Sequence, residues 1–499
     1  MKKTKYPKTS TVEFNISNFA EGIDAATDEN VTDFDKAVNS YNFEYKNGAL
    51  VESIGFESLT LPSYNDEGSV EKDARFELDE ESSHDFVKVA HFKSFDLLTQ
   101  KREDRLLVIA ADNIPCYSRL ITRAPIFTHL RDTFPTECPK MSNYHDGERD
   151  CFLIYSDSDR VYSWNAQQAP VQYSNVPLIH DFCEYNGKVV AVPSGERLTI
   201  RIDSTNLLQW TDQITSTSKI ITFDSERGYI NKLLTFNGYL FAIRDFGISR
   251  LDNSYSISHL LCSGSRMYAN TACVCGNRGL ILGKDGIYEF SNVSAQKLNL
   301  KINRLINGVS NQYAVAAFRN GVYYLACRLN FGDNKQIGCE VGEYKNNALI
   351  SFDTQTNKYS ICRGVDITYL CTIQYNSADK LLACFNGEHS SKVGQLTTDG
   401  KVFNLSETKF WSSPLTDLGY SNKIKYIKEI SLLSLYDVKL CVFSESESRE
   451  FNLKGSNIIS RVPVRIKGKQ IGISITSTTP KAYISNLKLI TNLMDNEYV

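Results

Sequence analysis

The chain contains 499 residues, of which 42% are hydrophobic and 23% charged, and its formal net charge at pH 7 is −3. These values are typical of a folded globular protein and exclude a mainly disordered chain, while the length predicts two or three domains. The near-neutral charge and the lack of a basic run argue against avid binding to nucleic acid through its phosphates.

The N-terminus carries lysines with no apolar stretch behind them, so the sequence predicts no signal peptide. No run approaches the ~18 consecutive apolar residues of a membrane-spanning helix, so no membrane segment is expected either. The chain is therefore expected to be made and folded inside a cell.

Residues 1–65 are predicted to form an N-terminal arm with a hairpin. Residues 12–16 alternate apolar and polar side chains, as a strand does. Asn47-Gly48 is a strong hairpin signal, because a type I′ turn needs positive φ at both central positions. The polar and acidic residues 64–85 are interpreted as a solvated loop or linker.

Residues 86–400 repeat one pattern, in which an apolar strand enters a turn, often Asn-Gly, and returns as a more apolar strand. The 27 tyrosines and 26 phenylalanines, against 4 methionines, also favour sheets. The units recur at intervals of roughly 30 to 60 residues, within the size of a propeller blade. The units are Asp104–Leu120, Asp150–Trp164, Phe182–Val192, Leu233–Leu251, Cys273–Phe290, Ala317–Ala326 and Thr372–Leu396.

A β-propeller of about seven blades is the predicted architecture of this region. Each unit is a small antiparallel sheet that cannot bury both of its faces alone, so neighbouring units must stack on it. Closing the stack into a ring leaves only short, protected edges, whereas the competing open solenoid has shorter and more regular repeats. Residues 330–345 are expected to form an insertion outside a blade.

Residues 401–499 are predicted to form a C-terminal antiparallel β-sandwich, so that the whole chain is all-β. Six runs alternate apolar and polar residues at spacings of roughly 10 to 15 residues, which is typical of a sandwich. The runs are Ile424–Ser434, Asp437–Ser444, Arg449–Leu453, Ser460–Ile466, Gly468–Thr476 and Ala482–Ile490.

Motifs that carry chemistry are largely missing. The seven histidines lack metal-ligand spacing, and no nucleotide-binding loop, serine-hydrolase motif or zinc-protease motif is present. The 13 cysteines include one C-x-C, Cys273 and Cys275, without the second pair that a zinc site needs, and are interpreted as buried free thiols. No catalytic, cofactor-binding or metal-binding residue is assigned, and the chain is expected not to be an enzyme.

Acidic residues are the remaining candidates for chemistry. Some propellers are glycosidases with paired carboxylates, for which Asp181, Asp245 and Asp285 are candidates, although each also fits a turn or a strand end. Asp157-Ser158-Asp159 has the opening spacing of a calcium loop, but the glycine and glutamate that an EF-hand needs do not follow. That segment is therefore predicted to be a simple hairpin turn.

Two segments resemble a family of bacteriophage virion proteins. The family opens with a strand, a Phe/Gly-containing turn and the pattern N-x-x-x-x-x-G-x-L-x-x-R-x-G, although Glu52-Ser53-Ile54 stands where a basic residue usually precedes the last glycine. The segment Phe410–Gly419, with the sequence FWSSPLTDLG, is similar to the start of the sandwich that follows the propeller in this family. The matching N-terminal residues are Phe19, Gly22, Asp24, Asn42, Gly48, Leu50 and Gly55.

The resemblance implies a tail nozzle or head-to-tail connector protein located in the virion and assembled in the host cytoplasm. Its subunits would form a ring of six or twelve, contact portal or adaptor proteins, and surround double-stranded DNA that passes through without sequence-specific binding. The ring would help to retain the genome or to release it during DNA ejection, with no cofactor. Such a ring requires heterologous contacts.

The N-terminal arm and the sandwich are the expected ring contacts. Deletion of residues 1–60 is therefore expected to leave the propeller folded but to abolish the ring. Three alternatives remain open at this point: a virion propeller that binds a host receptor or glycan, a propeller hydrolase, and a cytoplasmic scaffold.

Overall fold

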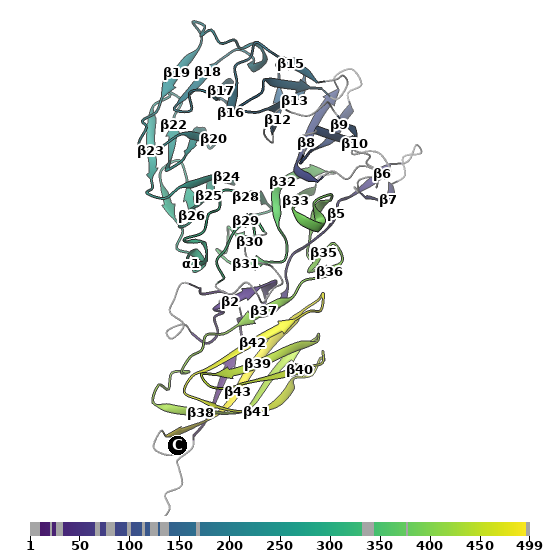
Figure 1. Cartoon of the computed structure of the whole chain (residues 1–499), viewed down its shortest axis with the longest axis vertical. Helices are drawn as coiled ribbons and strands as arrows, with labels where there is room; N and C mark the ends of the chain where they lie inside the picture. Colours follow the sequence, from purple (N-terminus) through teal and green to yellow (C-terminus); the bar gives the residue numbers. More distant parts are fainter. Residues whose placement is uncertain are drawn as a thin grey trace, which may run out of the picture.

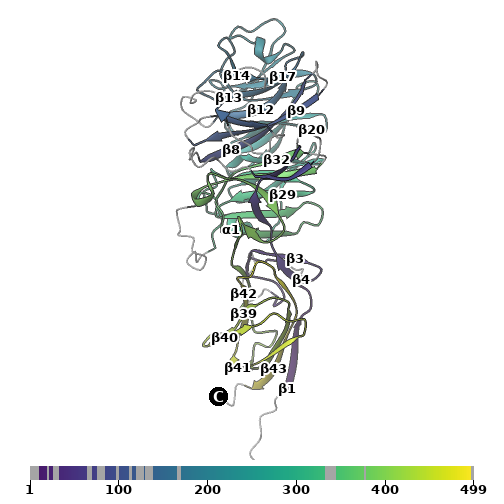
Figure 2. The same ribbon diagram turned by 90° about the vertical axis from the view of Figure 1, so that its right-hand side faces the viewer.

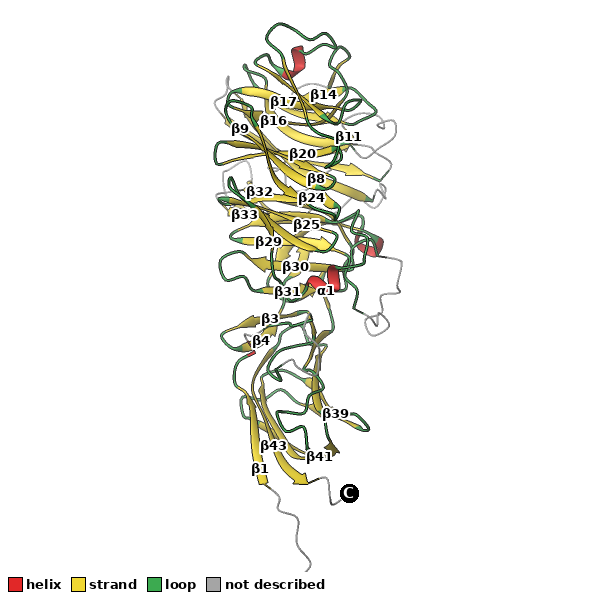
Figure 3. Cartoon of the chain, turned by 90° about the vertical axis from the view of Figure 1, so that its left-hand side faces the viewer, coloured by secondary structure: helices red, strands yellow, loops and turns green. Residues whose placement is uncertain are grey.

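The computed structural model shows an elongated all-β molecule in which a ring of sheets stands on a smaller two-layered body (Figures 1 and 2). Strands dominate, and helical segments such as α1 (Asn303–Ile306) are short (Figure 3). Within the described part of the chain, no helix is long and apolar enough to span a membrane. The described residues are 10–19, 22–25, 33–64, 70–75, 85–96, 101–111, 115–119, 128–129, 139–165, 170–331, 344–375 and 378–495.

The ring is a seven-bladed propeller, and each of its first six blades is a four-stranded antiparallel sheet formed by consecutive strands. Blade 1 contains β8 (Phe86–Asp96), β9 (Lys101–Ala110), β10 (Pro115–Arg119) and β11 (Thr128–His129). Blade 2 contains β12 (Lys140–His145), β13 (Asp150–Tyr155), β14 (Val161–Trp164) and β15 (Val171–Tyr173). Blade 3 contains β16 (Ile179–Tyr185), β17 (Lys188–Pro193), β18 (Thr199–Asp203) and β19 (Lys219–Thr222).

The next three blades have the same strand order. Blade 4 contains β20 (Ile230–Phe236), β21 (Tyr239–Arg244), β22 (Gly247–Leu251) and β23 (Ile257–Cys262). Blade 5 contains β24 (Met267–Cys275), β25 (Arg278–Gly283), β26 (Gly286–Phe290) and β27 (Ala295–Lys297). Blade 6 contains β28 (Val315–Arg319), β29 (Val322–Cys327), β30 (Ala348–Asp353) and β31 (Tyr359–Cys362).

Blade 7 is completed by a strand from the N-terminal part of the chain. Its first three strands are β32 (Ile367–Tyr375), β33 (Ala378–Phe385) and β34 (Val393–Thr397). The fourth is β5 (Gly55–Ser58), antiparallel to β34, and the short strands β35 (Lys401–Val402) and β36 (Leu405–Ser406) extend the sheet beyond it. The ring is closed because β32 contacts β8 of blade 1.

The predicted seven units are confirmed, with one unit in each blade. The first strand of each blade lies nearest the central axis and the last lies on the rim (Figure 1). Hydrophobic side chains fill each space between neighbouring blades, such as Phe92, Phe152 and Trp164 between blades 1 and 2. The predicted Asn-Gly turns are also confirmed, since Asn186 and Gly187 have φ of 53° and 67°, and the turns of blades 4 and 6 are alike.

The lower body is a sandwich of two antiparallel sheets. The first sheet has the order β3 (Phe43–Lys46), β4 (Ala49–Glu52), β43 (Tyr483–Asp495), β38 (Lys423–Ser434) and β41 (Ser460–Gly468), with β1 (Ser10–Ile16) also on β43. The second has the order β2 (Asn39–Tyr41), β37 (Lys409–Ser412), β42 (Ile471–Ser477), β39 (Val438–Ser444) and β40 (Ser448–Leu453). Each predicted C-terminal run overlaps one of these strands.

The N-terminal residues do not form an arm of their own. Strands β1, β3 and β4 lie in one sheet of the sandwich, β2 lies in the other, and β5 lies in the propeller. These strands are short, with four to seven residues in β1, β3, β4 and β5, and gain a core only by pairing with longer sheets. The predicted linker at 64–85 also differs, since β6 (Thr60–Tyr64) pairs with β7 (Val70–Arg75). Most of the predicted insertion, residues 332–343, lies outside the described residues.

The propeller and the sandwich share one core at their junction. A single cluster of buried side chains runs from blades 5 and 6 into both sheets of the sandwich. Asn42, at a positive φ of 60°, accepts a hydrogen bond from the Arg363 amide at 2.7 Å and donates its side-chain amide to the Thr408 carbonyl at 2.8 Å. These contacts fasten the N-terminal segment to blade 6 and to the connection between the two bodies.

Candidate functional site

The three aspartates considered for a carboxylate pair are each occupied by structural contacts. Asp181, on β16, accepts from the Leu233 amide of blade 4 at 2.7 Å and from the Tyr155 hydroxyl of blade 2 at 3.3 Å. It therefore joins three blades. No hydrogen bond or ion pair among the described residues links it to Asp245 or Asp285.

The other two aspartates stabilise turns. Asp245 accepts from the Tyr229 amide at 2.7 Å. Asp285 accepts from the Lys297 ammonium at 2.8 Å; burial acts to raise the pKa of this carboxyl, but Lys297 more than offsets that effect and the pKa is lowered. The shift at Asp285 is opposite to the raised pKa that a general acid would need.

Asp157-Ser158-Asp159 is a hairpin turn between β13 and β14, as predicted. The structure adds a partner that the sequence did not suggest, since Asp157 accepts from Nδ1 of His180 at 2.8 Å and from the Ser194 hydroxyl at 2.9 Å. Burial and the nearby Lys140 lower the pKa of His180, so the ring is neutral at pH 7. Because Ser194 donates to Asp157 and not to His180, the three residues lack the geometry of a nucleophilic triad.

This cluster continues across the neighbouring blade. Nη2 of Arg197 lies 3.2 Å from Nε2 of His180 and also donates to Asn231. Asn231 in turn donates to Asp245 at 3.0 Å. His180 and Asn231 lie at β-bulges near the starts of β16 and β20, which explains why side chains from strand ends meet here. The arrangement ties blades 2, 3 and 4 together on one face of the ring.

A pocket of about 400 Å³ lies between blades 2 and 3, beside this cluster. Its walls combine apolar side chains, including Leu178 and Ile220, with the charged side chains of Arg160, Glu196 and Arg201. The volume falls in the range of about 300–1,000 Å³ that small-molecule sites occupy. This pocket is the candidate functional site.

A long loop forms one wall of the pocket. Residues 204–218 connect the third and fourth strands of blade 3, whereas residues 252–256 and 291–294 make the same connection in blades 4 and 5. The loop contributes Trp210, Asp212 and Ile214 to the pocket wall. Long ordered loops in compact domains are often functional, because a short turn would connect the strands equally well.

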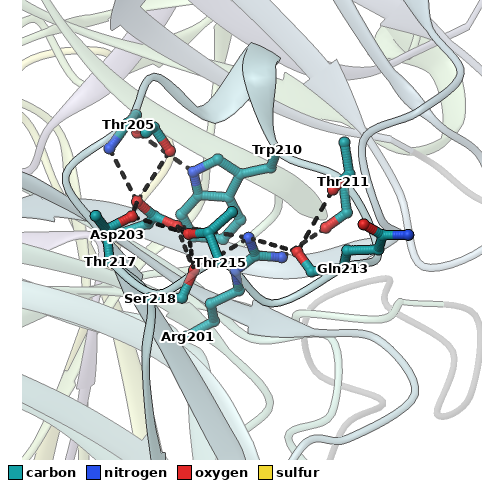
Figure 4. Close-up of polar contacts among 9 residues, drawn as sticks. All are labelled: Arg201, Asp203, Thr205, Trp210, Thr211, Gln213, Thr215, Thr217 and Ser218. Carbon is teal, nitrogen blue, oxygen red and sulfur yellow. Dashed lines mark hydrogen bonds and ion pairs between the residues drawn. The ribbon is translucent and has the colours of Figure 1, made fainter.

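The loop is held in place by Asp203, which is fully buried at the end of β18 (Figure 4). The carboxylate of Asp203 accepts from the amide and hydroxyl of Thr205 at 3.0 and 2.9 Å, and from the Ser218 hydroxyl at 2.5 Å. Thr215 and Thr217 add longer contacts at 3.5 and 3.4 Å. The two ends of the loop are thus fixed to one charged group.

Arg201 holds the middle of the loop. Its Nη1 donates to the Thr211 carbonyl at 2.7 Å, and its guanidinium lies 4.5 Å from the centre of the Trp210 ring (Figure 4). Its Nη2 lies 3.5 Å from the Asp203 carboxylate. Both charges are buried and paired, and their contacts hold the loop in position at the pocket wall.

Replacing Asp203 with asparagine is expected to cost about 2 kcal/mol of folding free energy at pH 7. Burial acts to raise the pKa of Asp203, but Ser218, Thr205 and Arg201 more than offset it and lower the pKa from 3.8 to about 2. The charged carboxylate therefore stabilises the fold above pH 3.8, and this contribution disappears as the pH falls through about 2.

Urea unfolding of wild type and Asp203→Asn between pH 7 and pH 2 measures this contribution. The stability difference is expected to be constant at neutral pH and to shrink below pH 4. Asp212→Asn, on the exposed side of the same loop, serves as the control and should change stability by less than about 0.5 kcal/mol. A difference that persists unchanged at pH 2 would contradict this explanation.

No family model and no curated protein matches the sequence. Solved structures resemble it only distantly. An extracellular domain from a hybrid two-component system of Bacteroides thetaiotaomicron has 11% identity and a TM-score of 0.43, over 86% of this chain and 58% of that one. The WD40 domain of Neurospora crassa Pan2 has 8% identity and a TM-score of 0.39, over 63% of this chain and 90% of that one. The chain thus spans little more than half of the length of the first of these proteins. The propeller fold is assigned here from the strand pairing of this chain.

Proposed function

We propose that the protein is a structural subunit of a bacteriophage tail, at the nozzle or the portal-proximal ring, where copies form a conduit for DNA. The observation that carries this proposal is the position of the residues on which the resemblance depends. These residues lie where the N-terminal segment joins the propeller to the sandwich, and this position at a structurally important junction supports the proposal.

Residues of both motifs meet in the sandwich. Phe19 packs edge-on against Trp411, with ring centroids 5.2 Å apart, so the N-terminal motif and the FWSSPLTDLG motif are in contact. The Phe19 amide donates to the carbonyl of Gly48 at 3.0 Å. Gly48 has a φ of 77°, which explains a glycine at this point of the pattern.

Three further motif residues reach the propeller or the chain beside it. Asn42 bonds to blade 6, as described above, and the ion pair between Asp24 and Lys301, at 3.5 Å, connects the segment to the chain after blade 5. Gly55 begins the strand that completes blade 7. The two bodies are therefore connected by several strands and not by a flexible linker, which suits a subunit that must keep its shape within a loaded assembly.

The mass and symmetry of the purified protein test this proposal. A ring should have six or twelve times the chain mass of 56.4 kDa and show an open axial hole in class-averaged electron micrographs. Light scattering across a range of protein concentrations measures the mass independently. A monomer at every concentration would contradict a self-assembling ring.

A second candidate function is recognition of a host receptor or glycan by the propeller. The pocket between blades 2 and 3 favours it, since a purely structural propeller has no need of a long loop held in place around a cavity. The two functions are compatible, because the pocket belongs to the propeller alone and the sandwich lies at the other end of the molecule (Figure 1). Neither function requires catalysis, a cofactor or a metal.

A further inference from the structure

Arg201 supports the wall of the pocket between blades 2 and 3. Arg201 is 5% exposed and lines the pocket, and its Nε has no hydrogen-bond partner. Its Nη1 and Nη2 are held by the loop and by Asp203. The Nε atom is itself buried, so a ligand in the pocket would meet other polar groups of the wall, of which Glu196 and Asp212 are exposed.

The charges of the pocket disfavour an anionic ligand. The Arg201 guanidinium is paired with the Asp203 carboxylate at 3.5 Å, which leaves Arg160, whose guanidinium donates to the Val176 carbonyl at 2.7 Å, as the remaining positive charge among the lining residues. Glu196 and Asp212 are exposed carboxylates on the same walls. An added phosphate or carboxylate would meet two negative charges, whereas a neutral group with several hydroxyls would find both donors and acceptors.

The apolar part of the pocket selects among neutral ligands. Ile214 is 64% exposed and Ile220 is 39% exposed, and both line the pocket. Large exposed apolar side chains beside polar groups are typical of a recognition surface. A saccharide presents C–H faces to such side chains and hydroxyls to the charged ones, and one or two sugar rings fit a cavity of about 400 Å³.

We infer that this pocket binds a neutral saccharide of one or two sugar units, either free or as the end of a surface glycan. Glu196 and Asp212 accept from sugar hydroxyls, and Ile214 and Ile220 contact an apolar face of the sugar. The inference names the ligand of the second candidate function above, and it is independent of whether the subunits form a ring.

The test uses the full-length protein and variants that change the pocket without touching the Asp203 contacts. A Cβ atom at Gly195 would meet nothing within 4 Å, so Gly195→Leu places a side chain at the pocket wall without a backbone clash. Gly264, between blades 4 and 5, is equally open, and Gly264→Leu is therefore the matched control. Asp212→Ala removes one proposed acceptor from the exposed side of the loop.

Binding of glucose, galactose, N-acetylglucosamine and disaccharides of these sugars is measured by saturation-transfer NMR and calorimetry, with glucuronate as the charged comparison. We expect saturable binding of at least one neutral sugar, weakened at least tenfold by Gly195→Leu and by Asp212→Ala, and unchanged by Gly264→Leu. Co-sedimentation with bacterial cell-wall polysaccharide distinguishes a glycan end from a free sugar.

Three results would overturn the inference: no binding of any neutral sugar at millimolar concentration, equal binding by Gly195→Leu, or tighter binding of glucuronate than of the neutral sugars. The ring proposal is judged separately, by the mass of the same samples. If the protein forms a ring but binds no sugar, only the saccharide inference is wrong. If it binds sugar as a monomer, only the ring proposal is wrong.

Discussion

Deletion of residues 1–60 is expected to prevent the propeller from closing, and not merely to abolish assembly. The deleted segment contains β5, the fourth strand of blade 7, which pairs with β34 through four residue pairs. It also contains Ile54, Phe56 and Leu59, which are buried against blades 1, 6 and 7. The truncated protein would expose the edge of β34 and the apolar surfaces of two inter-blade clusters.

The expected loss is comparable with the whole stability of a domain. Truncating one buried phenylalanine costs about 3–5 kcal/mol, and the propeller alone also loses two further buried apolar side chains and a strand ladder, against a typical total of about 5–15 kcal/mol. The same deletion removes β1, β2, β3 and β4 from the sandwich. Thermal unfolding and size-exclusion chromatography measure the effect. Deletion of residues 1–9, which precede the first described strand, is the control. A truncated protein lacking residues 1–60 that unfolds at the wild-type temperature would refute this role for β5.

This result would reverse what the sequence suggested, and the reason is the distance along the chain. The pairing of Gly55 with Thr397 joins residues more than three hundred positions apart, and local alternation reveals nothing about such partners. The seventh predicted unit, Thr372–Leu396, contained material for only three strands of its blade. The other predicted units also covered only two or three strands, so nothing in the last unit indicated that its fourth strand came from an earlier segment.

Local patterns predicted the remainder of the fold well. Asn-Gly turns fix hairpins through the φ values of two adjacent residues, so Asn237-Gly238 could be assigned without knowing any neighbour. The alternation in residues 424–490 similarly predicted the strands of the sandwich, because one face of each strand is buried there. Both signals depend on residues close together in sequence, which is why they succeeded.

The candidate site was not predicted, because its residues look like an ordinary polar loop. Thr215, Thr217 and Ser218 gain their role only from the buried carboxylate of Asp203, and Asp203 itself resembles any aspartate at a strand end. Two signals were available. The connection at 204–218 is longer than a blade turn requires, and it contains Trp210 and Ile214 among mainly polar residues.

Replacing Gly55 with alanine is expected to be the most damaging single-methyl substitution at the closure of the ring. A Cβ atom there would lie 2.0 Å from the carbonyl oxygen of Lys401, 2.7 Å from its nitrogen and 2.8 Å from its carbonyl carbon. All three are backbone atoms, so no side-chain rotation relieves the clash. Either β5 or β35 must move, and β35 is held by pairing with Phe56 and by the Phe403 amide, which donates to the Phe56 carbonyl at 2.7 Å.

We expect Gly55→Ala to lose about 3 kcal/mol or more, the upper range for forcing extra volume into a packed site. Gly264→Ala, where a Cβ meets nothing within 4 Å, should stay within about 0.5 kcal/mol of wild type. Urea unfolding followed by tryptophan fluorescence measures the free energy of unfolding of both variants. A loss in Gly55→Ala alone would show that the close packing of β5 against β35 is needed for the stability of the closed ring. Equal stability of the two variants would mean that β35 is free to shift, and that β34 and β5 close the propeller without it.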